Sequence, residues 1–341
     1  MKFQLLLCVT AMCAFLSGMM TPVAINAAEP VNIIFDTDMG NDIDDSMALA
    51  MLHNFEARGD CNLLAITLTN ESPYSPVYTQ FLNEFYGRQT PIGKAMHGVA
   101  TDNGPHMIPT LESKNSDGSS LFPWFDFEAK REFEPAVTLL RKTLAAAKDN
   151  DVVIVQVGFS SNLAALLDTP GDDISPLSGK ELMTKKVKFC SVMAGSFSNQ
   201  HKEYNVVMDI PAAQKLFNEC PVPIYVSDFQ IGLRVTSGPA NMNNDYAYCP
   251  NHPLQIAYHH HVGYEREQGT WDLTSVLYAV RPDRGYFGIS PAGVIHVADD
   301  GVTTFEEKAD GKAFLLTMDE FQAARVKEVF VWLCSEPPKS K

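Results

Sequence analysis

The sequence predicts an α/β fold: an open, mostly parallel sheet of the Rossmann-like type with helices on both faces. Two patterns predict this class. Short runs rich in Val, Ile and Leu, typical of strands buried on both faces, alternate with stretches whose apolar residues recur at helical spacing. Each such strand is followed by a helix instead of a tight turn, and this alternation is typical of a parallel sheet.

The individual elements follow from these patterns in chain order. Buried strands are expected at residues 31–35, 63–68, 152–157, 187–193 and 222–226. Helices are expected at residues 46–55, 135–148, 162–167 and 211–220. The longest irregular stretch, residues 101–126, is interpreted as a lid or an ordered surface loop. A small C-terminal appendage is predicted beyond about residue 289, with a hairpin (294–297 and 303–305) and a final helix (318 to about 332).

The first 28 residues have the features of a secretory signal peptide. The basic residue Lys2 precedes a short apolar run, and the small residues Ala27 and Ala28 offer a cleavage site. A retained membrane anchor is the alternative, but the apolar run is short and Pro22 follows it. The sequence therefore predicts export to the periplasm or the exterior, no membrane attachment after cleavage, and one domain spanning residues 29–341.

The overall charge argues against one class of partner. The chain has 41 acidic and 26 basic residues, a formal net charge of -15, which disfavours binding to a nucleic-acid backbone. Of the 7 cysteines, those beyond the signal segment are widely spaced and form no CxxC pair, so a zinc site of that kind is not expected. Buried free thiols are favoured over a single disulfide. A homo-oligomer is compatible with the sequence.

The most informative segment lies where the first strand ends and the first helix begins. It contains five closely spaced aspartates, Asp36, Asp38, Asp42, Asp44 and Asp45. In open α/β sheets the ligand crevice lies at the carboxyl ends of the strands. Acids that begin a helix explain two of these residues, but five crowded carboxylates repel one another unless a cation compensates them. Oxygen ligands of this kind suit a hard ion such as calcium or magnesium.

Two other chemistries use acidic loops, and the sequence fits them poorly. An EF-hand loop that starts at Asp36 would have Gly40 and Asn41 where the pattern requires an acid or Asn, followed by Gly. A phosphatase of the haloacid dehalogenase type matches the acids Asp36 and Asp38. However, the two residues that follow differ from those usual in that family, and the later aspartates have no role there.

Residues 36–49 resemble the N-terminal signature of the inosine-uridine-preferring nucleoside hydrolase family, in which Asp-Thr-Asp and a Gly precede an Asp pair and a helix. Later segments resemble further motifs of that family in the same order: Thr69-Asn70, residues 158–164, Met193-Ala194-Gly195 with Glu203-Tyr204-Asn205, Asp209-Ile210-Pro211, and Trp271-Asp272-Leu273-Thr274. The resemblance covers about residues 31–286. It implies the nucleoside hydrolase fold.

The resemblance also implies a role for individual residues. It makes Asp38 both a ligand of Ca2+ and the general base, and it assigns the other ligands to Asp45, Asp272 and the carbonyl of Ser161. The residues expected to bind the substrate are Asp44, Asn70, Asn199, Glu203, Asn205 and Trp271. In this scheme calcium holds the ribose hydroxyls and a water, and the carboxylate takes the proton of that water.

The implied function is an exported, calcium-dependent hydrolase that cleaves the N-glycosidic bond of ribonucleosides to ribose and free base. The alternative is a secreted, calcium-containing ribose or nucleoside receptor without turnover. Trp271 stands where some family members carry a His near the leaving base, and indole cannot donate a proton as an acid. His259-His260-His261 lies on a nearby segment, but such a run is more typical of a partly exposed helix face.

Overall fold

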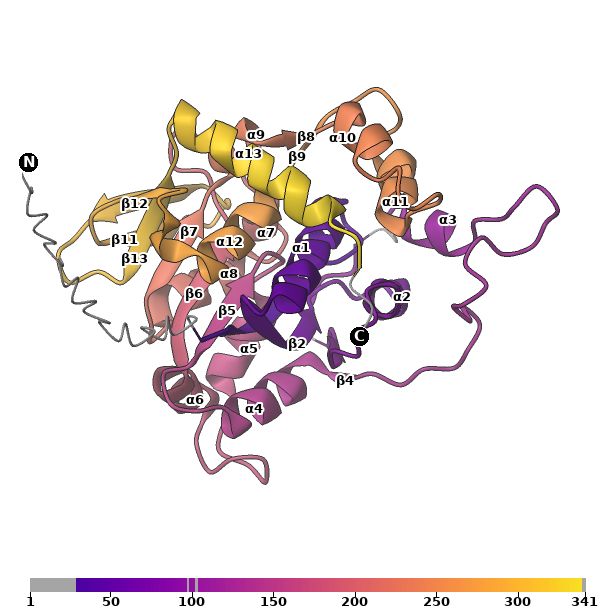
Figure 1. Ribbon diagram of the computed structural model, residues 1–341. Coiled ribbons are helices and arrows are strands. Elements are labelled where there is room, and N and C mark those ends of the chain that lie inside the picture. Colours follow the sequence, from indigo (N-terminus) through magenta and orange to yellow (C-terminus); the bar gives the residue numbers. More distant parts are fainter. Residues whose placement is uncertain (1–28, 97, 102–103, 339–341) are drawn as a thin grey trace, which may run out of the picture.

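An eleven-stranded sheet forms the centre of the molecule, and helices pack on both of its faces (Figure 1). The computed structural model describes residues 29–338 except residues 97, 102 and 103, so the predicted signal segment lies outside the described residues. The sheet contains β1 (Val31–Thr37), β2 (Cys61–Leu68), β3 (Ile92–Lys94), β4 (Glu134–Pro135), β5 (Val152–Gln156), β6 (Val187–Met193), β7 (Ile224–Ser227), β10 (Gly288–Ile289), β11 (Gly293–Val297), β12 (Thr303–Glu307) and β13 (Ala313–Thr317). A second, two-stranded sheet joins β8 (Thr236–Ser237) and β9 (Gln268–Gly269).

Most connections between these strands contain helices. The α-helices of the described residues are α1 (Asp44–Arg58), α2 (Tyr74–Phe85), α3 (Met107–Leu111), α4 (Ala136–Ala146), α5 (Ser161–Asp168), α6 (Gly179–Lys186), α7 (Tyr204–Val207), α8 (Ile210–Glu219), α9 (Phe229–Arg234), α10 (Pro239–Asn244), α11 (Pro253–His261), α12 (Trp271–Val280) and α13 (Glu320–Ser335). Within the described part of the chain, no helix has both the length and the apolar character needed to cross a membrane.

The sheet is parallel over most of its width, as the sequence predicts. Its strand order is β12-β11-β13-β7-β6-β5-β1-β2-β3-β4, with β10 paired to β13. All neighbours from β4 to β13 along this order are parallel, whereas β10, β11 and β12 pair antiparallel. The predicted hairpin is present as β11 and β12, and it continues the main sheet through β13. The C-terminal helix α13 is tied to α1 by a hydrogen bond from the Asn54 amide to the Leu333 carbonyl, 2.7 Å long.

Each face of the sheet has its own apolar core. Ile33 and Phe35 of β1 belong to the core that includes residues of α1, α2 and α12. Ile34, between them, belongs to the opposite core, which includes residues of α4, α5, α6 and α8. Successive side chains of a strand point to opposite faces, so an unbroken apolar strand must be covered on both sides. This requirement explains why the strands lack polar alternation.

The strand order reverses between β1 and β5, and this reversal determines where a ligand can bind. Strands β2, β3 and β4 lie on one side of β1, whereas β5, β6 and β7 lie on the other. Connections that leave the carboxyl ends of β1 and β5 therefore diverge, which opens a crevice between them. The turns after β1, β5 and β6 meet there.

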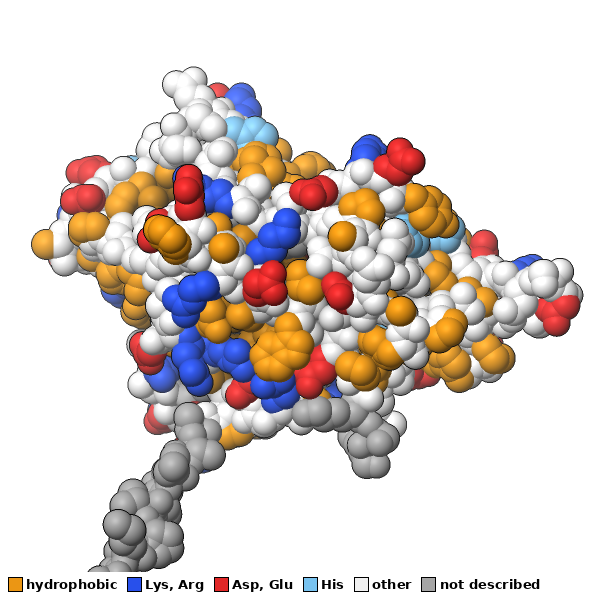
Figure 2. Space-filling view, turned by 45° about the horizontal axis from the view of Figure 1, so that its top comes forward, with side chains coloured by type: hydrophobic (Ala, Val, Ile, Leu, Met, Phe, Trp, Pro, Cys, Tyr) orange, Lys and Arg blue, Asp and Glu red, His pale blue; other side chains and the backbone are white. Residues whose placement is uncertain are grey.

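Charged side chains of both signs are interspersed on the face shown in Figure 2. Ion pairs of the described residues include Arg58 with Glu336 (3.2 Å) and Arg281 with Asp60 (2.7 Å). The Arg58 guanidinium also lies 4.1 Å from the centre of a Trp332 ring. These basic groups are thus paired with acids or packed on aromatic rings within the protein.

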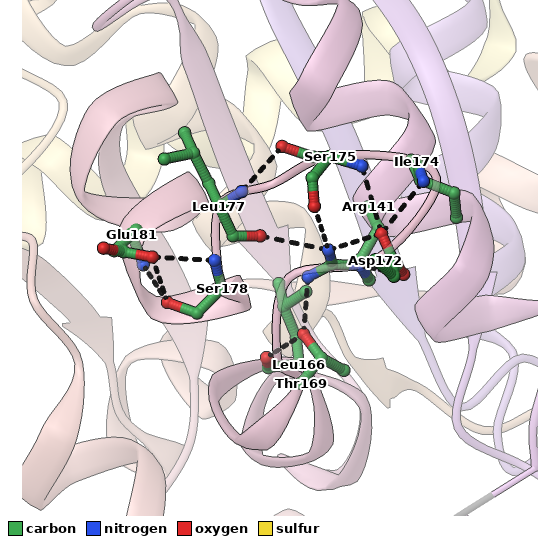
Figure 3. Close-up of polar contacts among 9 residues, drawn as sticks. All are labelled: Arg141, Leu166, Thr169, Asp172, Ile174, Ser175, Leu177, Ser178 and Glu181. Carbon is green, nitrogen blue, oxygen red and sulfur yellow. Dashed lines mark hydrogen bonds and ion pairs between the residues drawn. The ribbon is translucent and has the colours of Figure 1, made fainter.

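A buried arginine, Arg141 of α4, organises the connection between α5 and α6 (Figure 3). Its guanidinium donates to both carboxylate oxygens of Asp172 (2.7 and 2.8 Å) and to the Thr169 hydroxyl (2.8 Å). It also donates to the backbone carbonyls of Ser175 (3.2 Å) and Leu177 (3.0 Å). Because its side chain is 3% exposed, these contacts take the place of water. One side chain thus fixes an otherwise irregular segment against α4.

We expect Arg141→Ala to lower the free energy of unfolding by about 2–4 kcal/mol, because several acceptors of the α5–α6 connection lose the buried charged donor that they share. Arg141→Lys should recover only part of this loss, since an ammonium cannot reproduce the planar fork of donors. Urea unfolding followed by circular dichroism measures the difference. Lys142→Ala is the matched control, because that neighbouring side chain is 54% exposed. Equal destabilisation by Arg141→Ala and Lys142→Ala would contradict the role given to Arg141.

Candidate active site

The acidic turn predicted from the sequence lies at the carboxyl end of β1 and leads into α1. Asp38 follows β1 directly, and Asp44 and Asp45 form the first turn of α1, where the helix dipole favours negative charge. Gly40 has a φ of +104°, which an L side chain rarely adopts. An added Cβ there would lie 2.3 Å from the Met107 sulfur, so α3 packs tightly over the turn.

A cavity of about 230 Å³ opens at this turn. Seven residues that the sequence predicted for the site line it: Asp38, Asp44, Asp45, Glu203, Asn205, Trp271 and Asp272. The cavity is completed by residues that the sequence analysis did not assign to the site: Asn41, Asp42, Val157, Met193, Tyr204 and Phe229. The lining therefore combines a strongly acidic floor with aromatic side chains.

The carboxyl groups of the floor are buried and touch one another. Those of Asp38 and Asp272 lie within hydrogen-bonding reach of Asp45, which also accepts a hydrogen bond from the Thr37 hydroxyl. The backbone N–H of Asp272 donates to Asp44 Oδ2 at 3.0 Å. Burial raises the pKa of Asp45 to about 8, and the charge of Asp42 adds to the rise. Burial, followed by the charges of neighbouring aspartates, also raises the pKa values of Asp38, Asp44 and Asp272.

This donor set fits a hard divalent cation. Among the described residues, no Lys or Arg lines the cavity, so the carboxylates have no basic side chain beside them there. Carboxylate oxygens of Asp42, Asp44 and Asp45 lie within 4.8 Å of one another. Asp38 Oδ2 is buried and has no hydrogen-bond partner among the described residues. Crowded oxygen ligands of this kind can bind a metal ion, and a bound ion would offset their mutual repulsion.

Glu203 and Asn205 face the acidic floor from the turn that follows β6. The Glu203 carboxylate accepts hydrogen bonds from the backbone N–H groups of Asn205 (2.8 Å), Gly195 (2.9 Å) and Val206 (3.2 Å). Burial nevertheless raises its pKa to about 7. The Asn205 amide donates to the carbonyls of Val157 (2.6 Å) and Met193 (3.2 Å). Both side chains are therefore held in fixed positions at the cavity wall.

Three predicted site residues do not line the cavity. Asn70 is buried beneath the turn, where its amide N–H lies 3.4 Å from the carbonyls of both Asp38 and Met39. Asn199 lies on an exposed loop, and its side-chain oxygen accepts hydrogen bonds from Ser196 and from the backbone N–H of His201. The Ser161 hydroxyl donates to Asp209 at 2.6 Å. The predicted roles of these three residues stay predictions.

Asp36 supports the turn from within the sheet. Its carboxylate accepts hydrogen bonds from the Thr67 hydroxyl (2.5 Å) and the Asn162 amide (2.8 Å). The Asn162 amide also donates to the Leu68 carbonyl at 3.0 Å, which links the ends of β1 and β2 to α5. Burial raises the pKa of Asp36 to about 7. Asp36 is therefore a structural acid behind the cavity wall.

Aromatic residues form the other side of the cavity. The Trp271 indole N–H donates to the Phe229 carbonyl at 3.0 Å, and the two rings stack with centroids 5.5 Å apart. An added Cβ on Gly232 or Gly269 would lie 2.1 or 2.6 Å from the indole, so these glycines make room for it. The sequence analysis missed Phe229 because this residue belongs to no motif. Its position just after β7 could have indicated that it lies at the same edge of the sheet as the acidic turn.

The histidine run lies close to the acidic turn. It ends α11, where His261 is half-buried and packs against His106 with ring centroids 5.3 Å apart. Burial lowers the pKa of His261, whereas the charge of Asp42 opposes that change. His106 is fully buried, and neither of its ring nitrogens has a hydrogen-bond partner among the described residues. His97 lies outside the described residues.

Comparisons with known proteins identify a family and a fold that this chain resembles. The model of a family described as inosine-uridine preferring nucleoside hydrolase matches residues 33–313. A plant nucleoside hydrolase structure is similar with a TM-score of 0.68 at 20% identity, over 90% of this chain and 100% of that one. A purine-preferring ribonucleoside hydrolase from Gardnerella vaginalis gives 0.68 at 18% identity, over 90% and 99% of the two chains. An inosine-uridine preferring nucleoside hydrolase from Bacillus anthracis gives 0.64 at 15% identity, over 89% and 99%. Comparison with curated proteins found no match.

Removing divalent ions with a chelator is expected to lower the thermal midpoint of unfolding, and adding calcium or magnesium chloride back should restore it. A ligand at roughly 100 times its Kd stabilises a protein by about 2.7 kcal/mol. Differential scanning fluorimetry measures the shift. Asp45→Asn should abolish the metal-dependent part, whereas Asp310→Asn, which changes a side chain that is 81% exposed, should leave it intact. A midpoint that does not respond to any divalent ion would contradict the metal site.

Proposed function

The chain belongs to the inosine-uridine preferring nucleoside hydrolase family and is a hydrolase that acts on N-glycosyl bonds, and we propose that it is an exported, calcium-dependent enzyme that releases ribose and free base from purine ribonucleosides. The observation that supports the proposal best is the arrangement of side chains around the cavity. Buried carboxylates form its floor, and Glu203 and Asn205 lie beside them. Trp271 and Phe229 stack on one another at its other side.

The residues of the floor suit the hydrolytic step. Calcium, when bound, supplies positive charge that orients the ribose hydroxyls and an attacking water. Asp38 takes the proton of that water, a role supported by its buried and unpartnered Oδ2 atom. The surrounding carboxylates stabilise the positive charge that develops on the ribose ring in the transition state. Calcium is favoured over magnesium because calcium takes about 6–8 oxygen ligands in a flexible arrangement, which suits a cluster of several carboxylates.

The cavity wall suits the sugar. Asp44, Glu203 and Asn205 present oxygen acceptors and an amide group, which are the partners that ribose hydroxyls require. The backbone donors around Glu203 favour its ionised form, and burial opposes it. A hydroxyl of the substrate would give this carboxylate a further hydrogen-bond donor. We therefore assign the three residues to ribose binding.

The proposed export rests on the sequence of residues 1–28. The alternative function, a secreted receptor that binds the nucleoside without turnover, would use the same cavity. Release of free ribose from a panel of purine and pyrimidine nucleosides distinguishes the two. Binding of a nucleoside without any release of ribose by the metal-loaded protein would favour the receptor.

Asp38→Asn should reduce kcat by about 10²–10⁴-fold or more, because the amide keeps the shape of the side chain but cannot accept the proton. Circular dichroism should show that the variant stays folded. A reducing-sugar assay with inosine measures turnover. Asp36→Asn is the informative comparison, because it changes a buried acid that does not line the cavity. Turnover at the parental rate by Asp38→Asn would show that the base is another residue.

The aromatic side of the cavity predicts a preference for purine over pyrimidine ribosides. An indole face that stacks on a base is worth about 1–3 kcal/mol in nucleic-acid sites, and purines offer the larger surface. The measurement is kcat/KM for inosine and guanosine against uridine, in the parent and in Trp271→Ala. The variant should lose more activity toward the purines. A parent that favours uridine, or a ratio that Trp271→Ala does not change, would show that this ring does not contact the base.

A further inference from the structure

Two cysteines, Cys190 and Cys220, lie in the apolar core on the side of the sheet opposite α1 and α12. Cys190 lies in β6, and its backbone N–H donates to the Pro223 carbonyl at 2.9 Å. Cys220 is the residue that directly follows α8, and its sulfur lies 3.6 Å from the Val222 carbonyl. The backbone bond from Cys190 to Pro223 places the segment that precedes β7 beside β6, and the two thiols shift each other's pKa. Both residues belong to the same apolar core.

The two thiols differ in access. Cys220 lines a surface hollow of about 410 Å³ between the end of α8 and strands β11 and β13. Cys190 is fully buried and does not line it. Lys180 and Lys312 line the same hollow, together with the acids Glu219 and Asp310. Cys220, which is 8% exposed, is therefore the one of the two residues that a reagent in the hollow approaches first.

The surroundings also separate the two thiols chemically. The hydrogen bond from Cys190, followed by the Val222 contact and the charges of Lys312 and Lys180, lowers the pKa of Cys220 although burial opposes this change. The same hydrogen bond and burial raise the pKa of Cys190. Thiolates are the nucleophiles in disulfide exchange, so Cys220 is the attacking group.

The other three described cysteines have different neighbours, and Cys249 is the one of them that is partly exposed, with its sulfur 3.9 Å from the Pro250 carbonyl. The thiol of Cys61 lies 3.7 Å from the Leu52 carbonyl, and that of Cys334 lies 3.6 Å from the Met47 carbonyl. Burial, as the largest cause, raises the pKa of both thiols. Cys61 and Cys334 are therefore internal controls for thiols that are buried without an attacking partner.

We propose that Cys190 and Cys220 form a thiol–disulfide exchange site that accepts a low-molecular-weight disulfide as its oxidant. The Cys220 thiolate attacks one sulfur of the disulfide RSSR, forming a mixed disulfide and releasing RS⁻. The Cys190 thiol then gives up its proton, and its sulfur attacks the Cys220 sulfur. The Cys190–Cys220 disulfide forms, and the second RS⁻ leaves. Overall, two protein thiols and one RSSR give one protein disulfide and two RSH.

The new bond would connect β6 to the segment that joins α8 and β7. Neither cysteine lines the catalytic cavity, so the oxidised and reduced forms should hydrolyse nucleosides at the same rate. The crosslink restricts the unfolded chain, so the oxidised form should have the higher thermal midpoint. The inference is thus independent of the proposed calcium dependence and substrate.

The test incubates the native full chain with oxidised glutathione and then blocks free thiols under denaturing conditions. Trypsin separates the two cysteines into residues 189–202 and 216–234, neither of which contains another cysteine. We expect these two peptides to appear joined by a reducible bond, with both free thiols lost together. Cys190→Ser should stop at a glutathione adduct on Cys220, and Cys220→Ser should leave Cys190 unmodified. Cys334→Ser should behave as the parent does.

Three results would overturn the proposal. One is a parent protein that keeps glutathione on Cys220 without forming the linked peptide. Another is a parent in which Cys220 reacts no faster than Cys61 or Cys334. The third is a linked peptide that pairs either cysteine with a different one. All three are read from the parent protein, so they decide the question even if a serine variant fails to fold.

Discussion

Mutually repelling carboxylates, buried at the end of β1, are the constraint on which the rest of the site depends. Asp38 and Asp45 come from the segment where β1 ends and α1 begins, and Asp272 comes from the start of α12. They are packed together, and the described residues that line the cavity include no Lys or Arg. The raised pKa values of these three carboxyl groups reflect the free-energy cost of ionising them in a buried position. A bound ligand can offset this free-energy cost. Because the site offers only oxygen donors, the ligand that fits it is a hard metal ion.

The fold holds these groups in place from several directions. Asp36 and Asn162 join the ends of β1, β2 and α5, and Asn70 braces the backbone of the turn from below. The first turn of α1 supplies its dipole and the Thr37 hydroxyl supplies a donor. This polar support extends around the turn, so single substitutions there are expected to disturb geometry as well as charge. The positions of the acidic side chains therefore depend on the order of the strands that hold the turn.

The features predicted correctly from the sequence are those that a local residue pattern determines. Buried apolar runs located the central strands, with β6 matching at both ends and β1 extending by two residues. The crowding and spacing of the aspartates identified the acidic floor. The strands β3 and β4, at one end of the sheet, have three and two residues, which are too few to show a periodicity, and they were missed. Phe229 enters the cavity, and Asn199 stays outside it, because of how the loops after β6 and β7 fold over the sheet edge. That folding depends on tertiary contacts that no local pattern encodes.

An anomalous difference map from a crystal grown with calcium tests most directly whether a cation binds at the acidic turn. We predict one peak at the end of β1, surrounded by carboxylate oxygens of Asp38, Asp45 and Asp272 at about 2.3–2.6 Å, with about 6–8 oxygen ligands in total. A map without a peak there, with these carboxylates ordered in the same places and held by hydrogen bonds alone, would contradict the central role given to the cation.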